Sequence, residues 1–389
     1  MRKPALTLAA TALATLPVFA ACTENASSAD GDKKSDPRAL TVSSSADACD
    51  VSASSAPAGT LTFEVTNTGS QVTEFYLLGA DGLTIKAEIE NIGPGISRKL
   101  TVNAAPGKYV TACKPGMEGD GIRADFAVEA AADAPTVSAG DQQLTATALA
   151  NYKAYVNDQS DQLVTATQKF VDLYKAGKDD EARALYPEAR MHWERIETVA
   201  ESFGDLDPKT DAREADLEPG QKWTGWHRIE KDLWPPAGYQ ALKPQQRATY
   251  GEDLMTNIKT LDSRIAGLDY TVDQIANGSR GLLEEVANGK VTGEEEAWSH
   301  TDLWDFQANV DGARVGWEGV KPIVEGKDPE LGKQLDERFQ ALQALLDKQK
   351  QGDGFAFYDK VSDPDKKALS DAVNALSEPL SRLTAAVLS

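Results

Sequence analysis

The stretch LMTNIKTLDSRIAGLDYTVDQI, residues 254–275, spaces its long apolar side chains alternately four and three residues apart. These side chains are Leu254, Ile258, Leu261, Ile265, Leu268, Val272 and Ile275, and Leu282 and Val286 continue the register. Heptad spacing of this kind puts one apolar stripe along a helix and packs such helices nearly parallel to one another. The stretch therefore predicts a helix of an antiparallel bundle.

The same spacing returns near the C-terminus. The apolar side chains there are Leu369, Val373, Leu376, Leu380, Leu383 and Val387. Apolar periodicity predicts further helices at 142–176, 179–203, 293–322 and 329–349. Residues 141–389 are therefore predicted to form an all-helical domain.

The first part of the chain has a different period. Residues 60–69, TLTFEVTNTG, alternate Leu61, Phe63 and Val65 with polar neighbours, and similar pieces closed by Gly, Pro or Asn follow. Such alternation is typical of half-buried strands. It predicts a small β-sandwich over residues 40–130, joined to the bundle by a linker at 131–140, and leaves the topology of the sheets open.

The chain begins with an export signal. Residues 1–21, MRKPALTLAATALATLPVFAA, combine a basic start with a short apolar run and small residues before Cys22. This junction resembles a lipoprotein processing site, so we expect a lipidated Cys22, a flexible tether over 22–39 and anchoring at the outer face of the cytoplasmic membrane. Ordinary cleavage after Ala21, with release of the protein, is the alternative.

The net charge is strongly negative. It is −21 for the whole chain, and removal of residues 1–21, which carry two basic residues and no acidic one, brings it to −23. Such an excess repels nucleic acid and attracts cations. Nucleic-acid binding is therefore excluded, and cation binding is allowed.

One of only three histidines lies in TGWHRIEKDLW, residues 224–234. A helix over Trp223–Trp234 would run for about three turns and end at the prolines that follow, because proline lacks the N–H donor. On that helix His227 and Glu230 are three residues apart and share a face.

Carboxylates that could complete a site precede this helix. Glu194 and Glu197 have the same spacing, and Asp211 lies in the intervening loop. Together with His227 and Glu230 they would make a hard, oxygen-rich site suited to ferric iron, manganese or calcium. On spacing alone, a packed histidine beside solvated glutamates is the favoured interpretation.

The β domain offers a second set of ligand-type residues, Cys49, Glu74, Cys113 and Met117. Residues 1–191 contain no histidine, which excludes a blue-copper centre. A disulfide between the two cysteines and a thiolate–carboxylate site for copper or iron both remain open.

The segment EEEAWSHTDLWDF, residues 294–306, contains the last histidine, His300, with Asp302 and Asp305. We expect the nearby aromatic side chains Trp298, Trp304 and Phe306 to pack in the core with a hydrogen-bonded His300. The glutamates of 294–296 are expected to occupy the first turn of a helix, where the helix dipole favours anions. The motifs H-E-x-x-H, G-x-S-x-G and G-x-x-x-x-G-K-[ST] are absent. We therefore predict that the protein is not an enzyme.

Four motifs in this order carry a resemblance to a known family: GKYVTACKPGM (107–117), HWERIE (192–197), GWHRIE (225–230) and SHTDLWDF (299–306). The chain resembles exported iron-uptake components in which a cupredoxin-like domain is fused to an imelysin-type helical domain. The resemblance implies a Greek-key β-sandwich followed by a helical bundle.

The resemblance also implies a metal site. Gly225, His227 and Glu230 fit the G-x-H-x-x-E pattern of imelysin-type domains, in which carboxylates from a preceding helix and loop complete the site. In the β domain the family suggests an iron or copper site through the two cysteines, Glu74 and Met117, although Met117 stands where copper proteins commonly carry His.

The implied function is the capture of ferrous or ferric iron and its transfer to a membrane iron permease. A dye-decolourising haem peroxidase of the same uptake system is the other implied partner. The alternative function is that of a metal-dependent, peptidase-like hydrolase.

Overall fold

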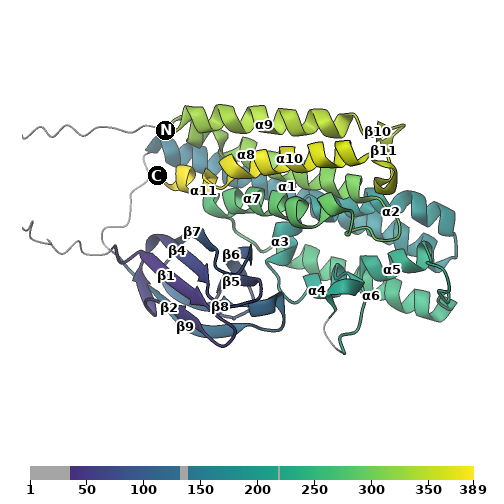
Figure 1. The fold of residues 1–389 in the computed structure, drawn as a ribbon, viewed down its shortest axis with the longest axis horizontal. Coiled ribbons are helices and arrows are strands. Elements are labelled where there is room, and N and C mark those ends of the chain that lie inside the picture. Colours follow the sequence, from purple (N-terminus) through teal and green to yellow (C-terminus); the bar gives the residue numbers. More distant parts are fainter. Residues whose placement is uncertain (1–35, 132–138, 218–219) are drawn as a thin grey trace, which may run out of the picture. The chain divides into compact units, whose positions relative to one another are not determined.

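The computed structural model in Figure 1 describes residues 36–131, 139–217 and 220–389. The predicted signal peptide and the lipidation site Cys22 lie outside the described residues. Strands occupy Ala39–Glu129 and helices follow from Ala139. Pro37–Ser389 form one compact unit. The predicted order of a β-sheet part followed by a helical part is confirmed.

The β part consists of two sheets, with strand orders β2-β1-β4-β7 and β3-β9-β8-β5-β6. The strands are β1 (Ala39–Ser44), β2 (Cys49–Val51), β3 (Ser55–Pro57), β4 (Gly59–Asn67), β5 (Thr73–Leu78), β6 (Ile85–Ile92), β7 (Ser97–Ala104), β8 (Gly107–Cys113) and β9 (Ile122–Glu129). Pairs β1–β4 and β3–β9 are parallel, and the other pairs are antiparallel.

The core of the β part follows the predicted alternation. Leu61, Phe63 and Val65 on β4 are buried, and the Phe63 ring lies 5.2 Å from that of Phe75 and 5.7 Å from that of Phe126, centroid to centroid. Phe75 and Phe126 belong to the other sheet. These aromatic contacts therefore join the two sheets, as a sandwich requires.

The helical part contains eleven α-helices within the described residues (Figure 1). They are α1 (Ala139–Lys175), α2 (Asp179–Glu194), α3 (Glu197–Glu201), α4 (Asp207–Thr210), α5 (Trp226–Leu233), α6 (Pro244–Ile265), α7 (Val272–Asn288), α8 (Asp302–Glu325), α9 (Pro329–Asp347), α10 (Asp363–Leu380) and α11 (Leu383–Leu388). Short 3-10 helices lie at Pro115–Met117, Glu214–Asp216, Lys290–Thr292 and Tyr358–Lys360, and a hairpin is formed by β10 (Lys350–Gln351) and β11 (Gly354–Phe355). None of the described helices has the length and apolar character needed to span a membrane.

The stretch 254–275 forms the predicted apolar stripe but not one continuous helix. Its apolar side chains are buried up to Ile265, where α6 ends, and the chain turns before α7 begins at Val272. Thr271 and Gln274 form a capping box that starts α7. The heptad register continues across this turn, which is why periodicity alone missed it.

Two other predicted helices are wrong in detail. The helix predicted at 179–203 is interrupted at Arg195 and Ile196, between α2 and α3. The helix predicted from residue 293 begins only at Asp302, so the glutamates of 294–296 lie in a connection and not in a first helical turn. Both departures position residues of the candidate site.

Candidate metal centre

The interruption between α2 and α3 brings two predicted ligands to one place. Glu194 is the last residue of α2 and Glu197 the first of α3, and both side chains are buried. Asp211 follows the short helix α4 and is also buried. One carboxylate oxygen from each of the three lies within 4.8 Å of the others, a spacing that could hold a metal ion.

Helix α5 lies against the backbone of the segment that carries Asp211. Gly225, immediately before α5, has φ 87°, and a Cβ on it would come within 2.1 Å of the Thr210 carbonyl oxygen. The Thr224 hydroxyl donates to the Lys209 carbonyl oxygen at 2.7 Å. The glycine of the G-x-H-x-x-E pattern therefore permits the close approach that places His227 beside Asp211.

Gly225→Ala is expected to lower the free energy of unfolding by about 3 kcal/mol, because the new methyl group meets backbone in a left-handed conformation. Gly220→Ala is the matched control, since Gly220 also has positive φ but no described residue other than its chain neighbours has an atom within 4 Å of the position that its Cβ would take. The free energy of unfolding of Gly220→Ala is expected to fall by about 1 kcal/mol. If urea denaturation shows the same loss of stability in both variants, the close approach of Gly225 to the Thr210 backbone is contradicted.

His227 is fully buried at the middle of the site. Its Nδ1 lies 3.2 Å from a Glu230 oxygen. Its Nε2 lies 3.3 Å from Asp211 Oδ1 and 3.4 Å from Glu295 Oε1, yet makes no hydrogen bond to any described residue. A buried ring nitrogen that faces two carboxylates in this way is suited to bind a cation held between them.

Glu230 is held firmly on the other side of the ring. Its Oε1 accepts the backbone N–H groups of Trp298 at 3.0 Å and Ser299 at 2.7 Å, and its Oε2 faces His227 Nδ1. In metal sites, a carboxylate on one imidazole nitrogen fixes the ring so that the other nitrogen can coordinate. Glu230 thus orients Nε2 toward Asp211 and Glu295.

The electrostatics of the centre favour a charged histidine. Burial and the neighbouring Arg190 lower the pKa of His227, but its contacts with Asp211, Glu230 and Glu295 outweigh them and raise this pKa well above its usual value. Burial raises the pKa of Asp211, but the Arg190 charge and the His227 contact bring it below its usual range. The imidazolium therefore carries a proton that a metal ion would have to replace.

Arg190 is the largest basic group in the centre, and its side chain is fully buried. Its guanidinium contacts the carboxylates of Asp211, Glu194, Glu295 (3.3 Å), Glu296 (2.7 Å) and Asp305 (3.5 Å). Burial lowers its pKa, but these carboxylates raise it well above its usual value. Arg190 therefore remains charged and neutralises part of the negative cluster.

Lys290, in the 3-10 turn after α7, is a second buried basic group of the centre, and Arg213 also lies 3.6 Å from Glu295. Its Nζ lies 2.9 Å from each Glu197 oxygen and 3.0 Å from Glu194 Oε2. Asn309 Nδ2 donates to the same two side chains, at 2.8 Å to Glu197 and 3.2 Å to Glu194. The two carboxylates thus share one ammonium and one amide, and Glu194 is also paired with Arg190.

The structure adds residues that the sequence interpretation does not assign to the site. Arg190, Lys290, Glu295, Glu296 and Asp305 are absent from the predicted ligand set. Arg190 lies one helical turn before Glu194, a spacing from which it could have been proposed. Lys290, Glu295 and Glu296 depend on how the connection between α7 and α8 folds, and Asp305 lies in the first turn of α8. With them, carboxylates outnumber basic groups, which suits a hard cation.

Among the described residues, His300 and Asp302 form no ion pair with Arg190, Lys290 or His227. Asp302 is buried and accepts the Glu296 backbone N–H at 3.2 Å. His300 is half-buried with φ 59°, and its carbonyl accepts the Tyr358 backbone N–H. Phe306 is fully buried as predicted, whereas His300 is only half-buried, so its predicted place in the core is wrong.

The β domain does not assemble the predicted Cys-containing metal site. Cys49 and Cys113 form a disulfide, the alternative left open by the sequence, and disulfide sulfurs are not the thiolates that bind metal. The Glu74 carboxylate accepts the Tyr76 hydroxyl at 2.5 Å and lies 3.8 Å from Lys114 Nζ. Met117 is 41% exposed. The four residues thus do not form a common ligand set in this oxidised form.

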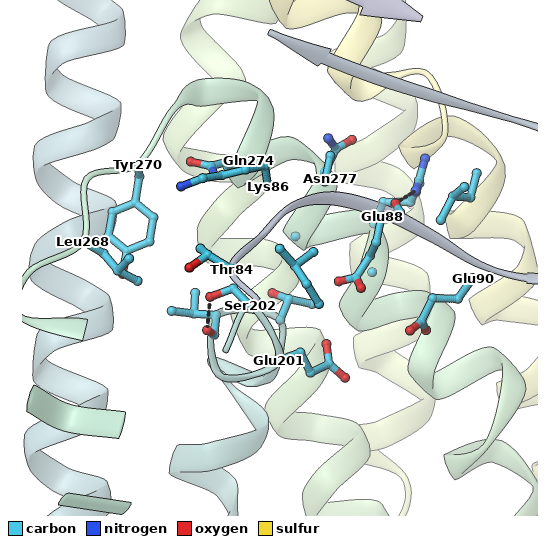
Figure 2. A pocket seen from close by; sticks show the side chains of 18 of the residues that line it. Thr84, Lys86, Glu88, Glu90, Glu201, Ser202, Leu268, Tyr270, Gln274 and Asn277 are labelled. Atoms are coloured by element: carbon cyan, nitrogen blue, oxygen red, sulfur yellow. Dashed lines mark hydrogen bonds between the residues drawn. The ribbon is translucent and has the colours of Figure 1, made fainter. Parts of the chain in front are cut away.

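Further carboxylates extend from the centre toward a neighbouring pocket. One oxygen each from Glu197, Glu201 and Glu285 lies within 4.8 Å of the others. Figure 2 shows Glu201 at the edge of this pocket, on the same side as Glu88 and Glu90 of β6. Burial and the charges of Glu197 and Glu285 raise the pKa of Glu201 well above its usual value. The surroundings of the centre are therefore acidic as well.

Comparison with known proteins shows the family to which the chain belongs. The imelysin family model matches residues 148–383, which include every element of the centre. The chain is 37% identical over 358 residues to the "Iron uptake system component EfeO" of Escherichia coli (strain K12), Shigella flexneri and Shigella sonnei (strain Ss046), covering 90% of this chain and 88% of each relative. The chain therefore belongs to the imelysin family, and within that family it is an EfeO-type protein.

Proposed function

We propose that this protein is the iron-binding component of an iron uptake system and that it captures ferrous or ferric iron in the buried centre of its helical part. The observation that carries the proposal is the Nε2 atom of His227, buried and without a hydrogen bond to any described residue, between Asp211 and Glu295. The role of the EfeO relatives in iron uptake supports the choice of ion.

The donor set fits iron by its chemistry. Oxygen ligands with one imidazole suit ferric and ferrous iron better than a thiophilic metal. We assign His227, Asp211 and Glu295 as the ligands that face one another, with Glu194 and Glu197 completing the set on the Asp211 side. Glu230, which the sequence interpretation made a ligand, is assigned the role of orienting His227.

The proposals on export, membrane anchoring and partners rest on the N-terminal sequence and on the family. We propose that the chain is exported, anchored through Cys22 and positioned to pass iron to a membrane permease, alongside a haem peroxidase. A hydrolytic function is not proposed, because His227 and its neighbours are buried and a peptide could not reach them without opening the fold.

Isothermal titration of the purified mature protein, with ferric citrate in air and ferrous ion under anaerobic conditions, tests this function. We expect His227→Ala to weaken or abolish iron binding. His192→Ala is the matched control, because His192 is half-buried and bonded to Gln159 at 3.0 Å, away from the centre. Failure of the unsubstituted protein to bind either ion, or equal binding by His227→Ala, would refute the proposed function.

A further inference from the structure

The ammonium group of Lys290 lies where a cation would be held by two of the proposed ligands. Lys290 is 1% exposed, and its Nζ contacts three oxygens of Glu194 and Glu197 at 2.9–3.0 Å. Those two carboxylates also share a ligand-type spacing with Asp211. A metal ion bound by both glutamates would therefore compete with the Lys290 ammonium for the same oxygens.

Lys290 and Arg190 differ in the contacts that they make with the carboxylates of the centre. Arg190 contacts carboxylates across the whole centre with a rigid, planar group, whereas Lys290 reaches only Glu194 and Glu197 from the far end of a flexible side chain. The amide of Asn309 also donates to both glutamates. If the ammonium leaves, Glu197 therefore keeps the Asn309 amide as a hydrogen-bond partner, and Glu194 keeps both this amide and Arg190.

A second group of acidic side chains can receive the ammonium. Glu285 lies five residues before Lys290, and its carboxylate belongs to the group formed with Glu197 and Glu201. Movement of Nζ away from Glu194 and Glu197 toward Glu285, whose charge already acts on Lys290, would leave the ammonium compensated, which avoids the large cost of an unpaired buried charge.

We propose that Lys290 is a tethered counter-cation that competes with iron for Glu194 and Glu197, and so limits the affinity of the centre and speeds release of the ion. The inference rests on the proposed function, since it concerns the same centre. In the metal-free protein the ammonium keeps the two carboxylates together; when iron binds, it withdraws. A carrier that must give up its cargo gains from such a built-in competitor, because binding without one would be slow to reverse.

Lys290→Met, which removes the charge and keeps most of the side-chain volume, is expected to tighten iron binding about tenfold or more and to slow iron dissociation into a chelator by a similar factor. Lys290→Arg, which keeps the charge, is expected to stay near the original affinity. The matched control is Lys321→Met, because Lys321 pairs with Asp336 at 2.6 Å away from the centre. A purely structural lysine would instead give equal or weaker binding and unchanged or faster dissociation in Lys290→Met, and that result would overturn the proposal.

A measurement on the unsubstituted protein is independent of how well the variants fold. A crystal structure of the iron-loaded protein is expected to show Lys290 Nζ beyond hydrogen-bond distance of both Glu194 and Glu197. Retention of either contact with iron bound would overturn the proposal. If the unsubstituted protein binds no iron, the proposed function and this inference both fail; if it binds iron and Lys290→Met binds no more tightly, only this inference fails.

Discussion

Asp211→Asn is expected to weaken iron binding by about 100-fold or more. Asp211 contributes an oxygen to two of the ligand-type groups, one with His227 and Glu295 and one with Glu194 and Glu197. The substitution keeps the shape of the side chain but removes a full negative charge from a buried site, where a charge a few ångströms from the ion is worth several kcal/mol.

The effect should be measured by iron titration with a competing chelator, and circular dichroism should show an unchanged helical content. Asp273→Asn is the matched control, because Asp273 is also fully buried but belongs to the start of α7 and accepts the Asn103 backbone N–H at 2.8 Å. We expect this control to bind iron as the original protein does. Comparable binding by Asp211→Asn and the original protein would remove Asp211 from the ligand set.

Arg190→Met is expected to lower the free energy of unfolding of the metal-free protein by about 3–5 kcal/mol. The substitution leaves buried carboxylates without the guanidinium that contacts them, which is far more costly than loss of an exposed ion pair. Iron should restore part of the lost stability, because an ion that binds only the folded state stabilises it and supplies positive charge to the same oxygens.

Urea denaturation with and without iron measures both effects. Arg264→Met is the control, since Arg264 pairs with Asp205 but its side chain is 33% exposed, and a loss of about 1 kcal/mol or less is expected. If Arg190→Met and Arg264→Met lose the same stability, the buried carboxylates do not depend on Arg190 for charge compensation.

Much of the fold was predictable because each part has a clear period. The alternation around Phe63 and the heptads around Leu261 indicate the sandwich and the bundle. The turn between Ile265 and Val272 was missed because the apolar register continues across it. The missed interruption after Glu194 did not prevent its pairing with Glu197, since residues three apart in one helix would also share a face.

The candidate site was predictable only where local spacing determines proximity. His227 and Glu230 share one face of α5, Glu194 and Glu197 have the same spacing, and the resemblance favours a metal site that these residues form with Asp211. The side chains of the connection after α7, including Lys290 and Glu295, could not be placed from spacing. That connection is held by long-range contacts, such as the bonds from the backbone near residue 298 to Glu230.

In the β domain the sequence could narrow the alternatives but not decide between them. The lack of histidine before residue 192 excluded a blue-copper centre, whereas the choice between a disulfide and a thiolate site depends on whether Cys49 and Cys113 meet in the fold. They are neighbours across the two sheets and are paired. Sequence separation alone carries no information on that contact.

The most direct measurement of the central claim is anomalous diffraction on both sides of the iron K edge from crystals of the iron-loaded protein. We expect an iron peak in the helical part, within coordination distance of His227 Nε2 and bordered by the carboxylates of Asp211 and Glu295. An iron peak found only elsewhere, for example beside Glu74 in the β domain, with none next to His227, would contradict it.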